Sequence, residues 1–158
     1  MRRKDRQLSE ADAWALLKLA SWGVLAFEPD EDGYPHAVPI NCAYVDGALL
    51  FHCAKAGKKL DILARDNRVC FAATIQHEMI PEEYTAHFES VICYGRISRL
   101  PDEEVTSALA VFATGVFKMP ISEGILKKSG EGAPATAILR MEIEHITGKR
   151  SGSLNSLG

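Results

Sequence analysis

The sequence has 158 residues, a length that fits one domain, and its 47% apolar and 25% charged residues are typical of a globular protein. The net charge of −3 argues against a nucleic-acid-binding protein, which would carry a large basic surplus. No apolar run is long enough to span a membrane or to act as a secretory signal. We expect one domain with flexible ends at residues 1–8 and 151–158, and no membrane or nucleic-acid partner.

The pattern of apolar and turn residues predicts six strands with helices between them. Ser9 and Asp12 form a capping signal for a helix that reaches Ala20. Asp46-Gly47 is a strong two-residue hairpin signal. The expected strands span 22–27, 36–45, 49–52, 68–75, 88–99 and 136–146, the further helices 58–65, 101–117 and 122–128, and the loops 29–35, 76–84 and 129–134. The first three strands would form an antiparallel meander, and the lack of a βαβα order favours a mainly β antiparallel barrel or sheet with peripheral helices.

The four cysteines are expected to be free thiols. None lies in a C-x-x-C pair, and all sit in apolar segments that predict strands. Small buried thiols of this kind indicate a reduced, cytoplasmic protein. Only Cys53 is considered as an activated thiol, because it lies beside a basic stretch.

Residues 49–65 are the stretch around which the function is predicted. A strand ends at His52, a loop of small residues carries Lys55, and a helix begins with Lys58 and Lys59. A helix start offers free N–H groups and partial positive charge, and phosphate is a common occupant of such a position. Taken alone, the stretch is more typical of a solvated turn whose lysines keep the protein soluble.

Other nucleotide and metal motifs are absent from the sequence. The Gly57-Lys58-Lys59 step is not a P-loop, because His52 stands where the first glycine is required and Leu60 follows the lysines. There is no G-x-G-x-x-G fingerprint and no H-E-x-x-H pair, so neither a Rossmann site nor a metal site is predicted.

Two further positions have both a functional and a structural interpretation. His52 lies at the entrance to the basic loop, where it could take part in chemistry or serve as a hydrogen-bonded structural residue. Pro39 removes a ladder donor from its strand, which indicates either a simple edge strand or an opening that exposes backbone groups to a ligand. Asn41, two residues on, can both donate and accept a hydrogen bond.

Seven segments, taken together and in order, resemble the Nim-type nitroimidazole-resistance proteins, which belong to the pyridoxamine 5′-phosphate oxidase-like flavoproteins. The segments are 33–41, 46–47, 51–61, 67–71, 83–91, 95–96 and 143–149. The resemblance implies an antiparallel six-stranded split β-barrel that binds FMN at the interface of a homodimer. The aromatic and arginine pattern that holds the substrate phosphate in pyridoxamine 5′-phosphate oxidases is not evident, which argues against pyridoxamine oxidation.

The resemblance also assigns residues to the cofactor. By it, the isoalloxazine ring is lined by Pro39, Ile40 and Asn41. The flavin is followed by Phe51, His52, Cys53 and Ala54. The phosphate is held by Lys58 and Lys59, with Lys55 beside them. The partner chain would contribute Glu89 and Ser90 to the flavin site. Lys149 would lie near the isoalloxazine ring.

We therefore expect an FMN-dependent oxidoreductase in which the flavin carries the redox chemistry. NADH, NADPH or another donor would reduce FMN, which would pass electrons to a small acceptor such as a nitro compound. His52 is the catalytic candidate, because it could supply a proton or position the acceptor. Lys149 would stabilise the reduced flavin. The alternatives are a flavin carrier or sensor without turnover, and a split barrel that binds haem through a histidine.

Overall fold

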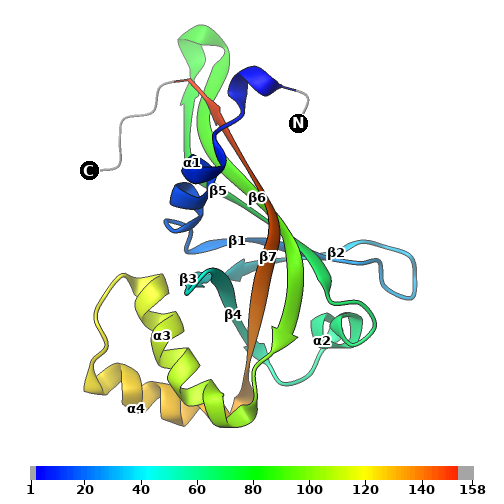
Figure 1. Ribbon diagram of the computed structural model, residues 1–158, viewed down its shortest axis with the longest axis vertical. Helices are drawn as coiled ribbons and strands as arrows, with labels where there is room; N and C mark the ends of the chain where they lie inside the picture. Colours follow the sequence, from blue (N-terminus) through cyan, green and yellow to red (C-terminus); the bar gives the residue numbers. More distant parts are fainter. Residues whose placement is uncertain (1–2, 153–158) are drawn as a thin grey trace.

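The computed structural model describes residues 3–152, in which seven antiparallel strands form one strongly curled sheet (Figure 1). Their order is β2-β1-β5-β6-β7-β4-β3, and the fold is the predicted mainly β split barrel. The strands are β1 Trp22–Phe27, β2 His36–Asn41, β3 Ala43–Val45, β4 Ala48–Ala54, β5 Arg68–Ile80, β6 Thr85–Arg99 and β7 Thr136–Ser151. The helices are α1 Glu10–Leu17, α2 Lys58–Leu63, α3 Val105–Phe117 and α4 Glu123–Gly132, with 3₁₀ turns at Lys4–Arg6, Pro81–Glu83, Asp102–Glu104 and Ala133–Ala135.

The predicted strand 36–45 is divided into β2 and β3, which lie at opposite ends of the sheet order. β2 pairs with β1, whereas β3 pairs with β4. Between them the Cys42 N–H leaves the ladder and donates to the Ser21 carbonyl at 3.0 Å. Both antiparallel hairpins of the predicted meander are therefore confirmed, but they do not form one continuous meander, because the chain changes pairing partner at Cys42. The same change gives seven strands instead of six.

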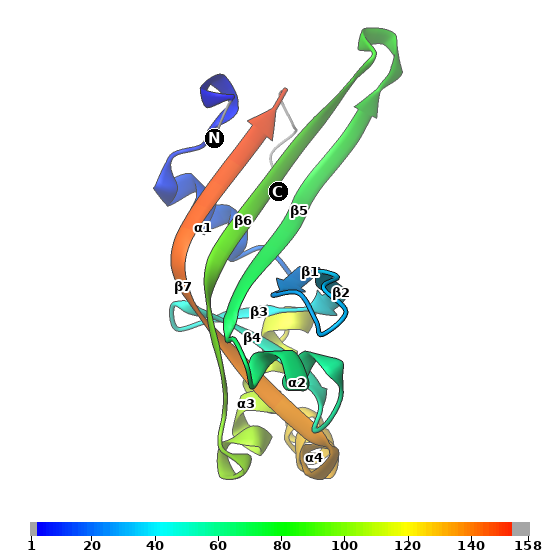
Figure 2. The same cartoon turned by 90° about the vertical axis from the view of Figure 1, so that its right-hand side faces the viewer.

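β5, β6 and the end of β7 extend away from the barrel as a three-stranded arm (Figure 2). The predicted loop 76–84 is wrong over most of its length, because β5 continues to Ile80 and pairs with β6 up to Thr85. Only Pro81–Glu83 and Tyr84 turn the chain, and Tyr84 has a φ of 50°. Polar residues form strand here because the neighbouring strand satisfies their backbone groups.

The chain ends are partly bound to the sheet. The Leu8 N–H donates to the Gly148 carbonyl at 3.0 Å, and Gln7 forms a bridge with Lys149. β7 runs past the predicted end at residue 146 to Ser151, since β6 pairs with it along this length. Of the ends that were expected to be flexible, residues 1–2 and 153–158 lie outside the described part of the chain.

The helices are short and lie at the margins of the sheet. Ser9 caps α1 as predicted, because its Oγ accepts the Asp12 N–H at 3.1 Å. The predicted loop 129–134 is wrong, since α4 continues to Gly132 while it packs against α3. Within residues 3–152, no helix is long and apolar enough to cross a membrane.

The two faces of β4 border two apolar clusters. Leu49 and Phe51 face the barrel interior, where the Phe51 ring lies 5.5 Å from that of Phe71. Leu50 faces the opposite way and packs with Val105 and Phe112 of α3. Since alternate residues of a strand point to opposite faces, β4 joins the barrel core to the helical cover.

The bend of β6 requires a glycine at position 95. The pairing of β6 with β7 shifts register between Tyr94 and Gly95, which marks a bulge. A Cβ atom at Gly95 would lie 1.9 Å from the Glu142 carbonyl oxygen. Only glycine therefore allows the two backbones to approach where the arm joins the barrel.

Candidate functional site

The four β4 residues assigned to the flavin, 51–54, are divided between the two faces of the strand. Phe51 is fully buried in the barrel core, and Cys53 is half-buried against the same core. His52 and Ala54 are exposed on the other face. Side chains from both faces cannot line one ligand, so Phe51 could reach a ligand outside the barrel only through its backbone.

His52 lies against the first helix of the helical cover. Its ring centroid is 4.9 Å from that of Phe112 in α3. Partial burial lowers the pKa of His52 below its ordinary value, which keeps the imidazole neutral at pH 7. A neutral ring can donate one hydrogen bond and accept another, which suits the predicted role in acceptor positioning, whereas proton supply would need the imidazolium form that burial disfavours.

A group of cations, here called the basic cluster, gathers where β4 runs into the loop before α2. Its members are Lys55, Lys59 and Arg99, and one carboxylate, Asp102, lies among them. Lys55 Nζ and Arg99 Nη2 each lie 2.8 Å from an Asp102 oxygen. The Lys59 ammonium makes no ion pair or hydrogen bond with any of residues 3–152. Three cations for one anion leave a net positive charge.

Beside the basic cluster is a cavity of about 390 Å³. Lys55, Arg99 and Asp61 provide its charged groups, and its other walls are largely apolar. They are Ala56, Leu60, Leu63, Ala64, Ile97 and Leu139. Lys59 does not line this cavity, and the two cations that do, Lys55 and Arg99, share Asp102. The net positive charge of the basic cluster still suits an anionic group such as a phosphate.

Lys58 has a different environment from Lys59. Its ammonium forms an ion pair with Asp30, a residue of the loop between β1 and β2. This pairing lowers the pKa of Asp30 and raises that of Lys58. The predicted helix 58–65 is only six residues long, Lys58–Leu63, so the positive charge at this position comes from side chains rather than from a helix dipole.

The residues predicted to line the ring are also divided by the alternation of their strand. Pro39 and Asn41 are exposed, whereas Ile40 packs against the barrel core. Pro39 lies in β2, at the end of the sheet order, where a missing ladder donor is tolerated. The Asn41 side chain donates to the Ser21 carbonyl at 3.2 Å and so has a fixed orientation.

Pro39 belongs to a row of paired residues that crosses five strands. The row continues with Val24, Ala72, Ile92 and Thr147, each on a neighbouring strand. We call this side of the sheet the outer sheet face. It exposes Trp22, Val24, Ile92 and Tyr94 by 58, 39, 38 and 48%. Ser90 and Lys149 form the pair two residues along from Ile92 and Thr147, so they lie on the same face.

Glu89 is placed apart from Ser90. It is only 7% exposed, pairs with Arg150 by an ion pair, and points to the side of the arm opposite the outer sheet face. The Lys149 ammonium lies 5.1 Å from the Phe88 ring centroid. Figure 2 shows the arm extending away from α2, so within one chain these arm residues do not join the predicted phosphate site.

The thiols are not ionised at neutral pH. Burial raises the pKa of Cys42 and of Cys93 to about 12. Burial also raises the pKa of Cys53, although Lys59 and Arg99 oppose the shift. Cys53 is therefore a neighbour of the basic cluster rather than an activated nucleophile. No three metal-ligating side chains come together among residues 3–152.

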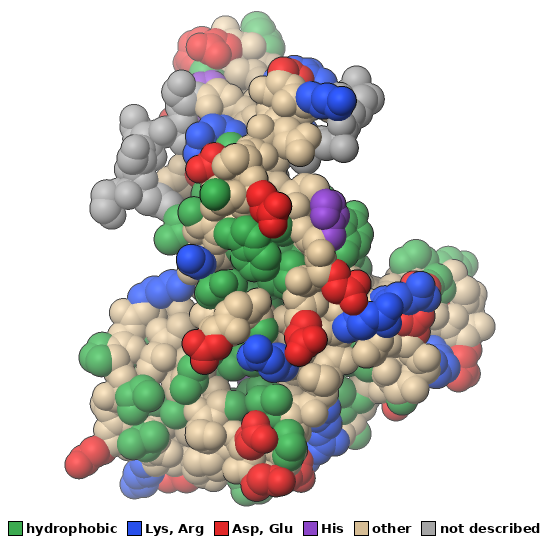
Figure 3. Space-filling model, in the orientation of Figure 1, with side chains coloured by type: hydrophobic (Ala, Val, Ile, Leu, Met, Phe, Trp, Pro, Cys, Tyr) green, Lys and Arg blue, Asp and Glu red, His purple; other side chains and the backbone are tan. Residues whose placement is uncertain are grey.

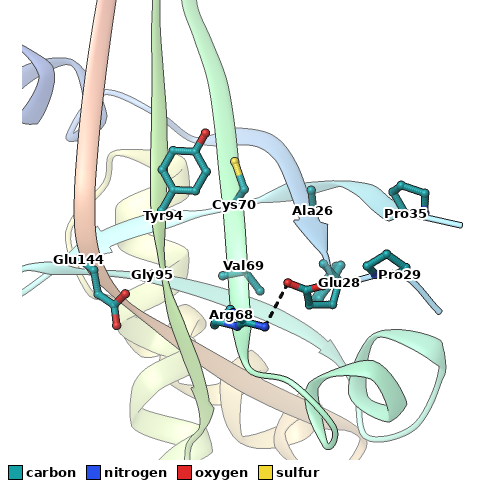
Figure 4. A pocket seen from close by; sticks show the side chains of 11 residues that line it. Ala26, Glu28, Pro29, Pro35, Arg68, Val69, Cys70, Tyr94, Gly95 and Glu144 are labelled. Carbon is teal, nitrogen blue, oxygen red and sulfur yellow. Dashed lines mark ion pairs between the residues drawn. The ribbon is translucent and has the colours of Figure 1, made fainter. Parts of the chain in front are cut away.

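A second cavity, of about 490 Å³, was not predicted from the sequence (Figure 4). Arg68 lies 3.5 Å from Glu28 at one side, and Tyr94 stands beside Cys70 at another. Pro29 and Pro35 close the end formed by the loop after β1. These residues come from four separate segments, and no local motif links them.

No motif in the sequence indicated that Asp30, Arg99 or Asp102 would lie beside the lysines. Asp30 lies in a loop that was predicted from its turn residues, and Asp102 lies in a predicted helix start. Lys55 and Asp102 are 47 residues apart in sequence. Their contact depends on the position of β6 beside β7, and β7 beside β4, which only the fold reveals.

Comparison with known proteins places this geometry in a family. The model of the family described as pyridoxamine 5′-phosphate oxidase matches residues 9–150. No curated protein sequence matches the chain.

Several solved structures share the fold. A candidate 5-nitroimidazole antibiotic resistance protein from Bacteroides thetaiotaomicron has 21% identity and a TM-score of 0.72, over 91% of this chain and 86% of the other. An FAD-binding protein from Mesorhizobium loti has 23% identity and a TM-score of 0.64, over 93% of this chain and 98% of the other. An FAD and haem binding protein from Mycobacterium smegmatis has 19% identity and a TM-score of 0.70, over 97% of this chain and 77% of the other. At these identities the likeness concerns the fold alone.

Proposed function

This chain belongs to the pyridoxamine 5′-phosphate oxidase family, and we propose from that premise that it is an FMN-dependent oxidoreductase. The observation that carries the proposal is the net positive charge of the basic cluster, in which Lys55 and Arg99 share Asp102 and Lys59 makes no ion pair within residues 3–152. Bound flavin would supply the redox chemistry by accepting electrons from a donor and passing them to an acceptor. NADH or NADPH is the proposed donor. A nitro compound is the proposed acceptor, in keeping with the candidate resistance protein among the similar folds.

The protein would contribute binding, orientation and proton handling. The basic cluster would hold the phosphate by charge-assisted hydrogen bonds. The exposed edge of β2, with Pro39 and the fixed amide of Asn41, would face the ring. His52 would present a neutral imidazole whose N–H could donate a hydrogen bond to an acceptor and so orient it.

We propose that the protein acts as a homodimer formed through the outer sheet face. The exposed apolar side chains of this face, Trp22, Val24, Ile92 and Tyr94, are costly in water, and a symmetric second copy would cover them. Ser90 and Lys149 lie on the same face and would then approach the ring bound by the partner. This arrangement explains how residues far from α2 in one chain could still serve a flavin site.

The first experiment is the visible spectrum of the purified protein, followed by anaerobic reduction. Flavin absorption that is bleached by NADH or NADPH and restored by a nitroaromatic supports the oxidoreductase. Bleaching by dithionite alone would leave a flavin carrier or sensor as the function. A haem spectrum would replace the flavin proposal, and a colourless protein that refuses both FMN and FAD would refute it.

A further inference from the structure

Lys58 and Lys59, the lysine pair at the start of α2, lie between two groups of side chains whose net charges have opposite sign. On the side of the β1–β2 loop, a cavity of about 200 Å³ has six charged side chains in its lining. They are Asp30, Glu31, Asp32, Asp61, Lys58 and Arg65. Four carboxylates against two cations leave a net charge of −2 on this side. Figure 3 shows acidic and basic side chains adjoining one another over α2 and this loop.

The carboxylate of Asp30 is held in an orientation that favours its ion pair with Lys58. Its side chain is only 9% exposed, and one carboxylate oxygen accepts the backbone N–H groups of Asp32 at 2.9 Å and Tyr34 at 3.2 Å. The other oxygen forms the ion pair with Lys58. The backbone of the loop thus fixes the direction of the carboxylate, and reorienting it would break the Asx turn.

A second ion pair ties the same loop to the end of α2. Arg65 Nη1 lies 2.8 Å from Glu31 Oε1. The loop is therefore bound to α2 at the first turn of the helix and again just beyond its last residue. We call this pair of contacts the loop clasp.

The opposite side of the lysine pair has the charge that a phosphate needs. The three cations of the basic cluster adjoin two carboxylates, Asp102 and Asp61, which leaves a net positive charge. Lys55 and Arg99 share Asp102, and Asp61 lines this cavity as well as the one on the loop side. Arg99 lines the cavity, and Lys59 begins α2 beside Leu60 and Asp61, which line it too. The charges of Lys59 and Arg99 both oppose the raised pKa of the Cys53 thiol at the end of β4. A phosphate at this point would meet an ammonium and a planar guanidinium, which suits bidentate binding. On the clasp side it would meet an excess of carboxylates, which repel it.

We infer that Lys59 and Arg99 bind the flavin phosphate, and that Lys58 is a positioning residue that closes the loop clasp through Asp30. The inference rests on the proposed flavin function for its first half only. It adds Arg99 to the site and removes Lys58 from it. Adjacent residues of the same type thus have separate roles, because the chain turns them toward opposite charges.

Titration of flavin-free protein with FMN, followed by the quenching of flavin fluorescence, tests the first half. Lys59→Met and Arg99→Met should each weaken binding by about ten- to a hundredfold, as expected for loss of a charge-assisted hydrogen bond. Lys58→Met should change the dissociation constant by less than about threefold, like the exposed control Lys127→Met on α4. Equal losses in the Lys58 and Lys59 variants would overturn the assignment, as would an unchanged Arg99 variant.

Urea unfolding without flavin tests the clasp independently. The variants are Asp30→Asn, Lys58→Met and the double variant. The double variant should lose less stability than the sum of the two single losses, because the second change removes a partner that is already missing. Additive losses would show that the two residues do not act together. A wild-type protein that binds no FMN would refute the proposed function and the phosphate assignment, and this cycle would still decide the clasp.

Discussion

Replacement of Trp22 by serine should weaken the association of two copies of the chain. Trp22 lies at one end of the outer sheet face, paired with Asn41, and 58% of its surface is exposed. For an indole side chain that fraction is roughly 140 Å². At about 25 cal/mol per Å², complete coverage by a partner would stabilise the dimer by at most about 3.5 kcal/mol for each tryptophan. A two-fold axis doubles the contribution, since each copy presents its own residue.

Conversion of area into affinity overstates the effect, because ordering and desolvation costs offset part of it. Truncation of an aromatic hot-spot residue typically costs about 2–4 kcal/mol, so we expect the dimer dissociation constant to rise by at least about thirtyfold. Sedimentation velocity over a wide range of concentrations measures this constant directly. The fold should be unaffected, which circular dichroism can check.

Phe117→Ser is a matched control for the tryptophan variant. Phe117 is the last residue of α3 and is 68% exposed. It belongs to no strand of the outer sheet face. Its replacement should leave the dissociation constant unchanged. The reasoning fails if Trp22→Ser dimerises as tightly as the wild type, or if the wild type stays monomeric at the highest concentrations.

Three further predictions concern stability. Phe71→Ala should lower the free energy of unfolding, measured in a urea titration, by about 3–5 kcal/mol, because Phe71 is fully buried against Phe51. A loss below about 1 kcal/mol would contradict this packing. Gly95→Ala should lower the thermal midpoint, because its Cβ would strike the Glu142 carbonyl, whereas Gly130→Ala, with no atom within 4 Å of the new Cβ, should not. The hydrogen bond from Arg68 lowers the pKa of Asp66 to about 2, so this carboxylate stabilises the fold above pH 3.8, and the contribution is lost as the pH falls through about 2. Asp66→Asn should therefore flatten the acid limb of the stability curve, and an unchanged limb would refute the pairing.

Local signals in the sequence predicted much of the fold. The strand 22–27 and the Asp46-Gly47 turn were found because a short apolar run and a positive-φ dipeptide are signals that act within a few residues. The loops expected at 76–84 and 129–134 were wrong for the opposite reason. Their polar and glycine-rich composition is typical of loops, but β6 and α3 provide partners that hold them as strand and helix.

The candidate site was predictable only in part. The lysines at 55, 58 and 59 are close in sequence, so a basic stretch was visible. Their acidic partners were not, because Asp30 and Asp102 approach from distant segments. The separation of Phe51 from His52 could have been predicted, since a strand turns successive side chains to opposite faces.

The most direct test of the account is the identity and amount of the chromophore that the protein carries. The protein should be purified, denatured to release any bound molecule, and the released molecule identified by mass spectrometry and quantified against the chain. The account predicts FMN at about one molecule per chain after incubation with excess FMN and removal of the unbound fraction. Recovery of no flavin after incubation with FMN or FAD would contradict it.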